Sequence, residues 1–336
     1  MRIGPVTLAN NVAAAPMSGV SDRAFRRAAA RAGAGLVVSE MVASRELARA
    51  RPDVVRRAEG DPAVRPFVIQ LAGRDPHWMA EGARLAEAAG ADIIDINMGC
   101  PARQVTGQLC GSALMREPDL ALRLVEATVE ATARPVTLKM RLGWDWDCLN
   151  APQIARRAES AGVRMLTVHG RTRNQFYKGA ANWRAIRAVK DAVSIPVLAN
   201  GDIVDLGSAR RALEESGADG LMVGRAAIGR PWLPGAIACA LAAGADRLKA
   251  PSPDEQLAIA IAHYDDMLAL YGEPLGVRMA RKHLAACVDH APVAVDPACR
   301  RAARAAICTL SSPTRVREAL RAVFDGETEA VVRLAA

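Results

Sequence analysis

Short apolar runs recur along the first two thirds of the chain, each followed by a longer stretch with helical spacing. Their length and β-branched content are typical of strands that a parallel sheet buries on both faces. The pattern therefore predicts eight buried strands. They are expected at 12–17, 36–42, 66–72, 93–98, 135–142, 165–169, 196–200 and 221–224.

A common lead-in precedes four of these runs, at residues 31–35, 88–92, 160–164 and 216–219. Each is an alanine- or serine-containing helix end closed by glycine, which takes the left-handed conformation that ends a helix. Alternating helices and parallel strands imply right-handed crossovers. Eight such units predict an α/β fold, a (β/α)₈ TIM barrel, rather than an open doubly wound sheet, whose glycine-rich fingerprint is missing after the first strand.

The pattern changes to helices alone after Trp232, and Pro251-Ser252-Pro253 forms a linker. Helical spacing begins near Asp254, and further helical segments are expected near 277–288, 297–309 and 314–324. We therefore predict a barrel domain over residues 1–243 and a small all-α helical domain over 244–336.

Composition indicates a soluble globular protein, because 51% of residues are hydrophobic and 24% are charged. No apolar run reaches the roughly 18 residues needed to span a bilayer, and Met1–Asn10 does not read as a signal peptide. We expect a cytoplasmic protein without a membrane partner, and a monomer rather than an obligate oligomer. The seven cysteines are odd in number and have no zinc-ligand spacing, so neither a disulfide framework nor a metal site is expected.

The net charge of +8 is compatible with a polyanionic partner but weak evidence for one, because 39 of the 44 basic residues are arginine. Genome composition alone can produce that bias. Within the tail, six Arg or Lys against two Asp lie between Arg278 and Arg304, which predicts a local basic face. A solvated helix surface would look the same on charge alone.

Polar side chains follow the predicted strands at their carboxyl ends, where barrels of this kind place their chemistry. A buried lysine or histidine there carries a desolvation cost unless a ligand or a hydrogen-bonding partner meets it. Lys139 has a simpler reading as a salt-bridge partner of Asp95 or Asp202, and His169 as a hydrogen-bonded core histidine. The mouth residues are Pro16, Met17, Ser18, Gln70, Asn97, Cys100, Lys139, Arg141, His169, Arg171, Asn200, Gly201, Asp202, Gly224 and Arg225.

Two features of the mouth point to specific chemistry. The glycine turns at Gly201 and Gly224 follow the last two strands, where these barrels commonly bind phosphate, and Arg225 adds positive charge. Cys100 stands directly after a strand and before Pro101, which disfavours helix at that position and leaves the thiol in a loop.

Several motifs together resemble the tRNA-dihydrouridine synthases, and most closely their bacterial B branch. They are Ala-Ala-Pro-Met-Ser-Gly-Val-Ser-Asp-Arg-Ala-Phe-Arg at 14–26, Asp-Ile-Asn-Met-Gly-Cys-Pro at 95–101, Lys-Met-Arg at 139–141, His-Gly-Arg-Thr-Arg at 169–173, Ala-Asn-Gly-Asp-Ile at 199–203 and Gly-Arg-Ala-Ala-Ile-Gly-Arg-Pro-Trp at 224–232. The resemblance covers essentially all of the barrel and reaches residues 278–283 of the tail.

The resemblance implies an FMN-binding barrel that reduces a uridine of tRNA, expected in the D-loop, to 5,6-dihydrouridine with NADPH or NADH as the reductant. It places Pro16, Met17 and Ser18 beside the flavin ring, Gln70 at its pyrimidine edge, Lys139 and His169 against the flavin, and Asn200, Gly201, Asp202, Gly224 and Arg225 at the phosphate side. It makes Cys100 the proton donor. The tRNA contacts it implies are Asn97, Arg141, Arg171, Arg173, Arg278, Arg281 and Lys282. Cys110 departs from the small residue expected there and adds a second thiol to the Cys100 loop.

Three other interpretations of the sequence stay open at this point. An FMN barrel acting on a small pyrimidine or enone explains the mouth but gives the helical tail no task. A class I aldolase would use Lys139 as a Schiff base. An RNA-binding protein on a former enzyme scaffold is disfavoured by the complete set of polar residues at the mouth.

Overall fold

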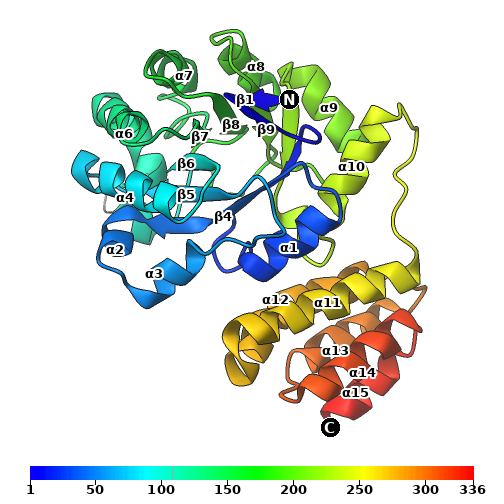
Figure 1. Ribbon diagram of the computed structural model, residues 1–336. Coiled ribbons are helices and arrows are strands. Elements are labelled where there is room, and N and C mark those ends of the chain that lie inside the picture. Colours follow the sequence, from blue (N-terminus) through cyan, green and yellow to red (C-terminus); the bar gives the residue numbers. More distant parts are fainter. Residues whose placement is uncertain (108) are drawn as a thin grey trace.

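The computed structural model describes residues 1–107 and 109–336. Eight parallel strands close into a barrel in the order β10-β3-β4-β5-β6-β7-β8-β9, with helices around it (Figure 1). The predicted (β/α)₈ barrel is therefore confirmed. The strands are β3 (Val12–Ala14), β4 (Leu36–Ala43), β5 (Val68–Ala72), β6 (Ile93–Met98), β7 (Val136–Arg141), β8 (Met165–His169), β9 (Val197–Asn200) and β10 (Gly220–Val223).

The strand ends lie close to their predicted places, and prolines explain the largest of the differences. Pro66, Pro135 and Pro196 were expected to open strands, but each lies just outside the ladder. Proline has no N–H to donate to a neighbouring strand, so pairing begins after it. Similarly, β3 ends before Pro16, and the chain leaves the barrel wall there.

Helices follow each strand and cover the barrel on its outside (Figure 1). The outer helices are α1 (Arg23–Arg31), α2 (Ser44–Ala48), α3 (Pro52–Arg57), α4 (Pro76–Ala88), α6 (Pro118–Glu130), α7 (Ala151–Ser160), α8 (Arg184–Lys190), α9 (Leu206–Ser216) and α10 (Leu233–Ala242). Short helical turns in the loops at the mouth are α5 (Arg103–Thr106), η1 (Gly111–Arg116) and η2 (Arg225–Ala227).

The barrel interior is apolar at one end and polar at the other. Ala13, Val68, Ile93 and Leu198 form part of a buried apolar cluster inside the barrel. Further along each strand, inward positions become polar, as at Lys139 of β7. This division leaves the carboxyl end of the barrel as the place for chemistry.

A two-stranded hairpin, β1 (Arg2–Ile3) and β2 (Val6–Thr7), precedes the barrel and was absent from the sequence prediction. Its strands are too short to show alternation. Ile3 and Leu8 belong to the same buried cluster as the barrel interior, so this segment packs against the apolar end of the barrel.

Five helices form a second unit with its own buried apolar cluster. They are α11 (Pro253–Tyr271), α12 (Glu273–His290), α13 (Pro297–Ile307), α14 (Pro313–Phe324) and α15 (Thr328–Ala335). The first four match predicted segments, whereas α15 was missed, because an eight-residue helix shows little periodicity. No helix in the described parts of the chain is long and apolar enough to cross a bilayer.

The helical unit contacts the barrel through α1, which packs on α11. Phe25 of α1 meets the rings of His263 and His283, with centroid distances of 6.0 and 5.8 Å, and the two imidazoles lie 4.6 Å apart. Around them, Tyr271 donates a hydrogen bond of 3.0 Å to Asp22. The junction thus combines apolar packing with two buried titratable rings.

Burial lowers the pKa of His263 to about 4 and the pKa of His283 well below its ordinary value of 6.5. Both rings are therefore neutral at pH 7. In the unfolded chain they take up protons as the pH falls below about 6.5, and the folded state resists this, so acid favours unfolding. The charge of Asp266 raises the pKa of His263 and so opposes the effect of burial. The charge of Lys282 lowers the pKa of His283 further.

We expect the urea midpoint of unfolding to fall between pH 7 and pH 5, with a loss on the order of 2 kcal/mol for each histidine. The double variant His263→Leu, His283→Leu should lose much less stability over the same interval, because it has no protons to take up there. Equal losses in the two proteins would contradict a role for these rings.

Candidate functional site

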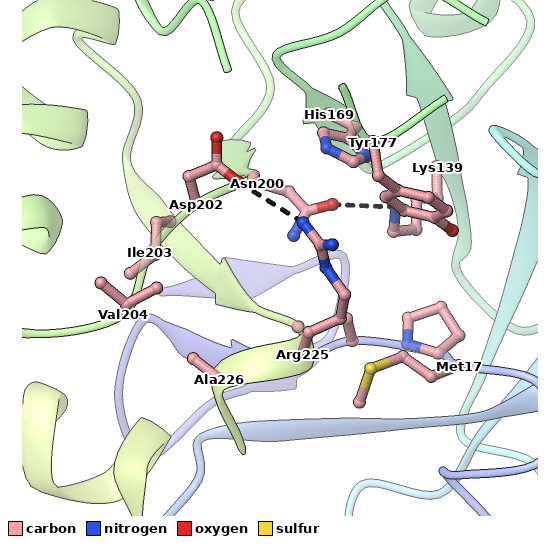
Figure 2. A pocket seen from close by; sticks show the side chains of 14 residues that line it. Met17, Lys139, His169, Tyr177, Asn200, Asp202, Ile203, Val204, Arg225 and Ala226 are labelled. Carbon is pink, nitrogen blue, oxygen red and sulfur yellow. Dashed lines mark hydrogen bonds and ion pairs between the residues drawn. The ribbon is translucent and has the colours of Figure 1, made fainter. Parts of the chain in front are cut away.

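The strand ends surround two adjoining cavities at the mouth of the barrel. One has a volume of about 250 Å³ and the other about 530 Å³. Residues common to both walls are Pro16, Met17, Lys139, His169, Tyr177 and Arg225, so the two form one continuous depression. Figure 2 shows the smaller cavity, with Lys139, His169 and Tyr177 on one side and Asp202, Ile203 and Val204 on the other.

The predicted mouth residues are divided between these cavities. Asn200, Gly201, Asp202 and Gly224 line only the smaller one. The larger cavity is lined by the other predicted residues Ser18, Gln70, Asn97, Cys100 and Arg141. The sequence prediction therefore gathered residues from seven strand ends that do meet at one site.

Lys139 is a buried cation that lines both cavities, with 9% of its surface exposed. Its Nζ donates a hydrogen bond of 3.1 Å to Oδ1 of Asn200 (Figure 2). The Nδ2 of Asn200 donates in turn to the Met222 carbonyl. It pairs with neither Asp95 nor Asp202. Burial, followed by the charge of Arg141, lowers the pKa of Lys139 to about 8. An ammonium with one neutral partner favours an electron-rich ligand beside it.

His169 is buried beside Lys139, and Nη1 of Arg171 lies 3.2 Å from its Nε2. Because guanidinium only donates, Nε2 is the acceptor and the ring proton resides on Nδ1. Burial, with the charges of Lys139, Arg141, Arg171 and Arg225, holds the pKa of His169 well below its ordinary value. His169 is therefore a neutral hydrogen-bonding group at pH 7.

Arg171 lies buried in the wall of the site, which is a correction to the tRNA contact that the resemblance implied for it. Its side chain is 2% exposed, forms an ion pair of 2.5 Å with Asp202, and donates to the carbonyl groups of Lys178 and Gly179. These partners hold the guanidinium inside the protein, where it cannot meet an external phosphate. Its position instead orients His169 and Asp202.

The turn after β9 brings the backbone close to His169. Gly201 has φ of +112°, and a Cβ there would lie 2.8 Å from Cδ2 of His169, so this position requires glycine. Asp202 also has a positive φ of 52°, and its carboxylate accepts from the Ala181 N–H at 2.8 Å. Its ion pair with Arg225, 3.6 Å long, appears in Figure 2.

A chain of hydrogen bonds links Asp95 to the loop that carries Cys100. Asp95 accepts from Thr137 at 2.6 Å and from Gln70 at 2.7 Å. The amide of Asn97 then donates to Gln70 at 2.8 Å. Finally, Oδ1 of Asn97 accepts from the main-chain N–H of Cys100 at 3.0 Å. The sequence analysis considered Asp95 only as a salt-bridge partner of Lys139, whereas in the structure it anchors this chain, and burial raises its pKa.

Cys100 is half-buried and lines the larger cavity. Its backbone is fixed on both sides, because its carbonyl accepts from the N–H and the hydroxyl of Ser112 at 3.1 and 2.8 Å. None of these bonds uses sulfur. Cys110, in the same loop, is half-buried, and burial raises the pKa of its thiol.

Arg141 shares the larger cavity with Cys100 and is 1% exposed. Its Nε and Nη1 donate to three main-chain carbonyls, those of Gly99, Thr172 and Phe176, at 2.8–2.9 Å. Burial lowers its pKa to about 10, so it stays charged at pH 7. A fixed cation therefore faces the same space as the thiol.

Two aromatic residues of the mouth, Phe176 and Tyr177, were missed from the sequence. Tyr177 is 50% exposed, lines both cavities, and lies 4.7 Å below the guanidinium of Arg225. Phe176 lies against Arg173 at 4.8 Å. Two adjacent aromatic residues in an otherwise polar loop after β8 were the sequence signal that could have identified them as residues of the site.

Arg278, Arg281 and Lys282 are exposed on α12. None forms an ion pair within the described residues. The helix packs beside the mouth, since a Cβ at Gly229 after β10 would lie 2.5 Å from the Ala286 backbone. A Cβ at Gly19 after β3 would lie 2.9 Å from Nζ of Lys282. The predicted basic face thus adjoins the barrel mouth.

Across residues 1–107 and 109–336, no three His, Cys, Asp or Glu side chains are grouped as metal ligands would be.

Comparisons with known proteins identify the family to which the chain belongs. A family model described as dihydrouridine synthase matches residues 13–321. The chain is 60% identical over 271 residues to a probable tRNA-dihydrouridine synthase of Rhodobacter capsulatus, covering 80% of this chain and 83% of the relative. It is 49% identical over 286 residues to tRNA-dihydrouridine synthase B of Pseudomonas putida, covering 84% of each.

Among solved structures, morphinone reductase aligns with a TM-score of 0.51 and 16% identity over 76% of this chain and 91% of that chain. That likeness concerns the barrel fold only. The family model and the relatives span most of the chain, so the chain belongs to the dihydrouridine synthase family, which comprises flavin-dependent oxidoreductases.

Proposed function

We propose that the protein reduces uridine in tRNA, within the D-loop, to 5,6-dihydrouridine, with FMN as its flavin and NADPH or NADH as the reductant. The observation that carries this proposal is the position of Cys100, whose side chain lines the same cavity as Lys139, His169 and Arg141. A thiol and buried cations that line one cavity could act together on a pyrimidine bound there beside a flavin.

The donor set at the mouth fits FMN. Lys139 offers a buried ammonium to an electron-rich ring edge, and Gln70 keeps one amide hydrogen beyond its bond to Asp95. Pro16, Met17 and Ser18 would border the ring. The smaller cavity suits the phosphate, because it is lined by Arg225 and by Gly224, where a Cβ would meet only Ala15 at 3.9 Å. Asn200, Gly201, Asp202 and His169 would complete that side.

Saturating the C5–C6 bond of uracil requires a hydride at C6 and a proton at C5. The bound flavin supplies the hydride. Cys100 holds the proton and donates it to C5 from the other face of the base, because a positioned S–H group can act as a general acid as charge develops there. Asn97 positions the Cys100 loop and keeps one amide hydrogen for the base.

A uridine stacked within folded tRNA must leave its stack to reach this cavity, at a cost of about a few kcal/mol. Contacts to tRNA phosphates offset that cost. Arg278, Arg281 and Lys282 lie on the exposed face of α12 beside the mouth, and Arg173 lies at the rim. Arg141 and Tyr177 would meet the base itself, since both line the larger cavity.

The function is tested by two measurements on the purified protein. Its absorption spectrum should show bound flavin, and incubation with unmodified tRNA and NADPH should raise the mass of one uridine by that of two hydrogens. Free uridine should not be turned over at a comparable rate. Reduction of free uridine as fast as tRNA would favour a small-molecule oxidoreductase instead.

Replacing Arg281 with alanine should weaken tRNA binding and lower the slope of log affinity against log salt by about one, the value for one lost phosphate contact. Affinities measured at several salt concentrations test this. Arg164→Ala is the matched control, because Arg164 is exposed and precedes β8 at the opposite end of the barrel. If both variants keep the wild-type slope, α12 does not hold phosphate through Arg281.

A further inference from the structure

A second group of cations lies across the mouth from α12. Helix α12 packs beside the loops that follow β3 and β10, whereas this group is built from the loops after β6, β7 and β8, on the far side of the barrel order. The loops are joined directly, since the N–H of Arg173 donates to Gly143 and the N–H of Asn174 donates to Trp144. Arg173 also reaches Thr106 of α5 at 3.3 Å.

Arg103, Arg116 and Arg173 bring three positive charges together here. None of them forms an ion pair with a carboxylate in the described part of the chain. Burial, followed by the charges of Arg103 and Arg116, lowers the pKa of Arg173. Its Nε is buried without a hydrogen-bond partner. Cations that repel one another and have no counter-ion are arranged for an anion from outside the chain.

Tryptophan is interleaved with these cations. The guanidinium groups of Arg116 and Arg173 lie 4.0 and 4.5 Å from the ring centroid of Trp144, which fixes both arginines in place. Two residues further, Trp146 has 56% of its surface exposed, the largest fraction among the exposed large hydrophobic side chains of the described residues. An exposed indole in the same loop as the Trp144 ring that holds these arginines offers a flat face to an unpaired base.

The tip of the loop also carries Asp145 and Asp147. Oδ1 of Asp145 accepts from the N–H of Asp147 at 3.2 Å, which closes the turn. Their charges disfavour phosphate directly at Trp146. The same loop therefore separates two kinds of contact, with phosphate at the arginines and a base at the indole.

We propose that Arg103, Arg116, Arg173 and Trp146 bind the tRNA strand next to the target uridine, with phosphates on the arginines and an unpaired neighbouring base stacked on Trp146. We call this the arginine–tryptophan surface. The proposal rests on the proposed function, since it takes the substrate to be tRNA. It continues the active site, because Arg173 lies against Phe176 and Phe176 lines the Cys100 cavity.

Such a surface explains how an extruded base is kept in the cavity. Once a uridine leaves its stack, its neighbours lose a stacking partner, and an aromatic side chain can replace it. Together with α12, the surface would hold the strand on both sides of the mouth. An RNA strand suits this combination better than an acidic peptide, which needs the charges but no exposed indole.

The stacking contact is tested with Trp146→Ala. Stacking of one base is worth a loss of roughly five- to 150-fold in tRNA affinity when the ring is removed. The slope of log affinity against log salt should not change, because no phosphate contact is lost. Trp146→Phe should recover most of the affinity. An affinity equal to that of the wild type in Trp146→Ala would overturn the stacking role.

The phosphate contacts are tested with Arg103→Ala and Arg116→Ala. Each should lower the salt slope by about 0.7 to 0.9, as expected for one phosphate contact. Arg164→Ala again serves as the control. A lower melting temperature with unchanged tRNA affinity and slope would mean that the Arg116–Trp144 stack only stiffens the loop, and would overturn the proposal. So would light scattering that shows a wild-type dimer converted to monomer by Trp146→Ala.

Failure of this inference is distinct from failure of the proposed function. If the wild type forms dihydrouridine in tRNA while all three variants bind tRNA as it does, only the arginine–tryptophan surface is excluded. If the wild type neither binds nor modifies tRNA, both proposals fall together.

Discussion

Cys100→Ala should bind flavin and tRNA as the wild type does, while its rate of dihydrouridine formation falls by about 100- to 10,000-fold, the usual contribution of a positioned general acid. The reason for intact binding is structural. The bonds that fix residue 100 run through its N–H to Asn97 and through its carbonyl to Ser112, so alanine keeps the loop in place. Only the proton donor is removed.

Cys110→Ala provides the matched control, because Cys110 is a half-buried thiol of the same loop that lines neither cavity. Its activity should equal that of the wild type. Single-turnover assays with reduced enzyme and saturating tRNA separate proton transfer from binding. Full activity in Cys100→Ala, or a comparable collapse in Cys110→Ala, would remove Cys100 from the chemistry.

Lys139→Met should have the second largest effect. We expect its turnover rate to fall by about 100- to 1,000-fold and its flavin affinity to fall as well. Methionine fills much the same space but provides no charge. The ammonium lies in a buried site, and within residues 1–107 and 109–336 it bonds to Asn200 alone, so its interaction with an electron-rich ligand is weakly screened by water.

The pH dependence gives Lys139 a signature that a merely structural role would not produce. Its pKa is about 8, so the side chain is charged at pH 7 and loses its proton as the pH rises through 8. Flavin affinity of the apoprotein should therefore fall between pH 7 and pH 9 in the wild type and stay level in Lys139→Met. Lys178→Met, at an exposed position in the loop after β8, should behave like the wild type. A parallel decline in all three proteins would assign the effect to another group.

The sequence was sufficient to predict the barrel, since buried parallel strands show themselves as short apolar runs and prolines fix where pairing begins. Cys100 could be placed at the mouth for the same reason, because a strand end and a following proline are local features. Asn200, Gly201 and Gly224 followed from their positions after the last two strands. The β1–β2 hairpin and α15 were missed, because segments so short have no readable period.

The tertiary structure alone decided which partners these side chains find. Arg171 and Arg173 are two residues apart, yet the first is locked inside by Asp202 and the second stacks at the rim on Trp144. The junction of His263 with Phe25 depends on residues more than two hundred positions apart, as does the bond from Tyr271 to Asp22. Hydrophobic period and turn chemistry are set by neighbours in the chain, so sequence reveals them. Burial, ion pairing and shifted pKa values depend on groups brought together from distant segments, so only the folded chain determines them.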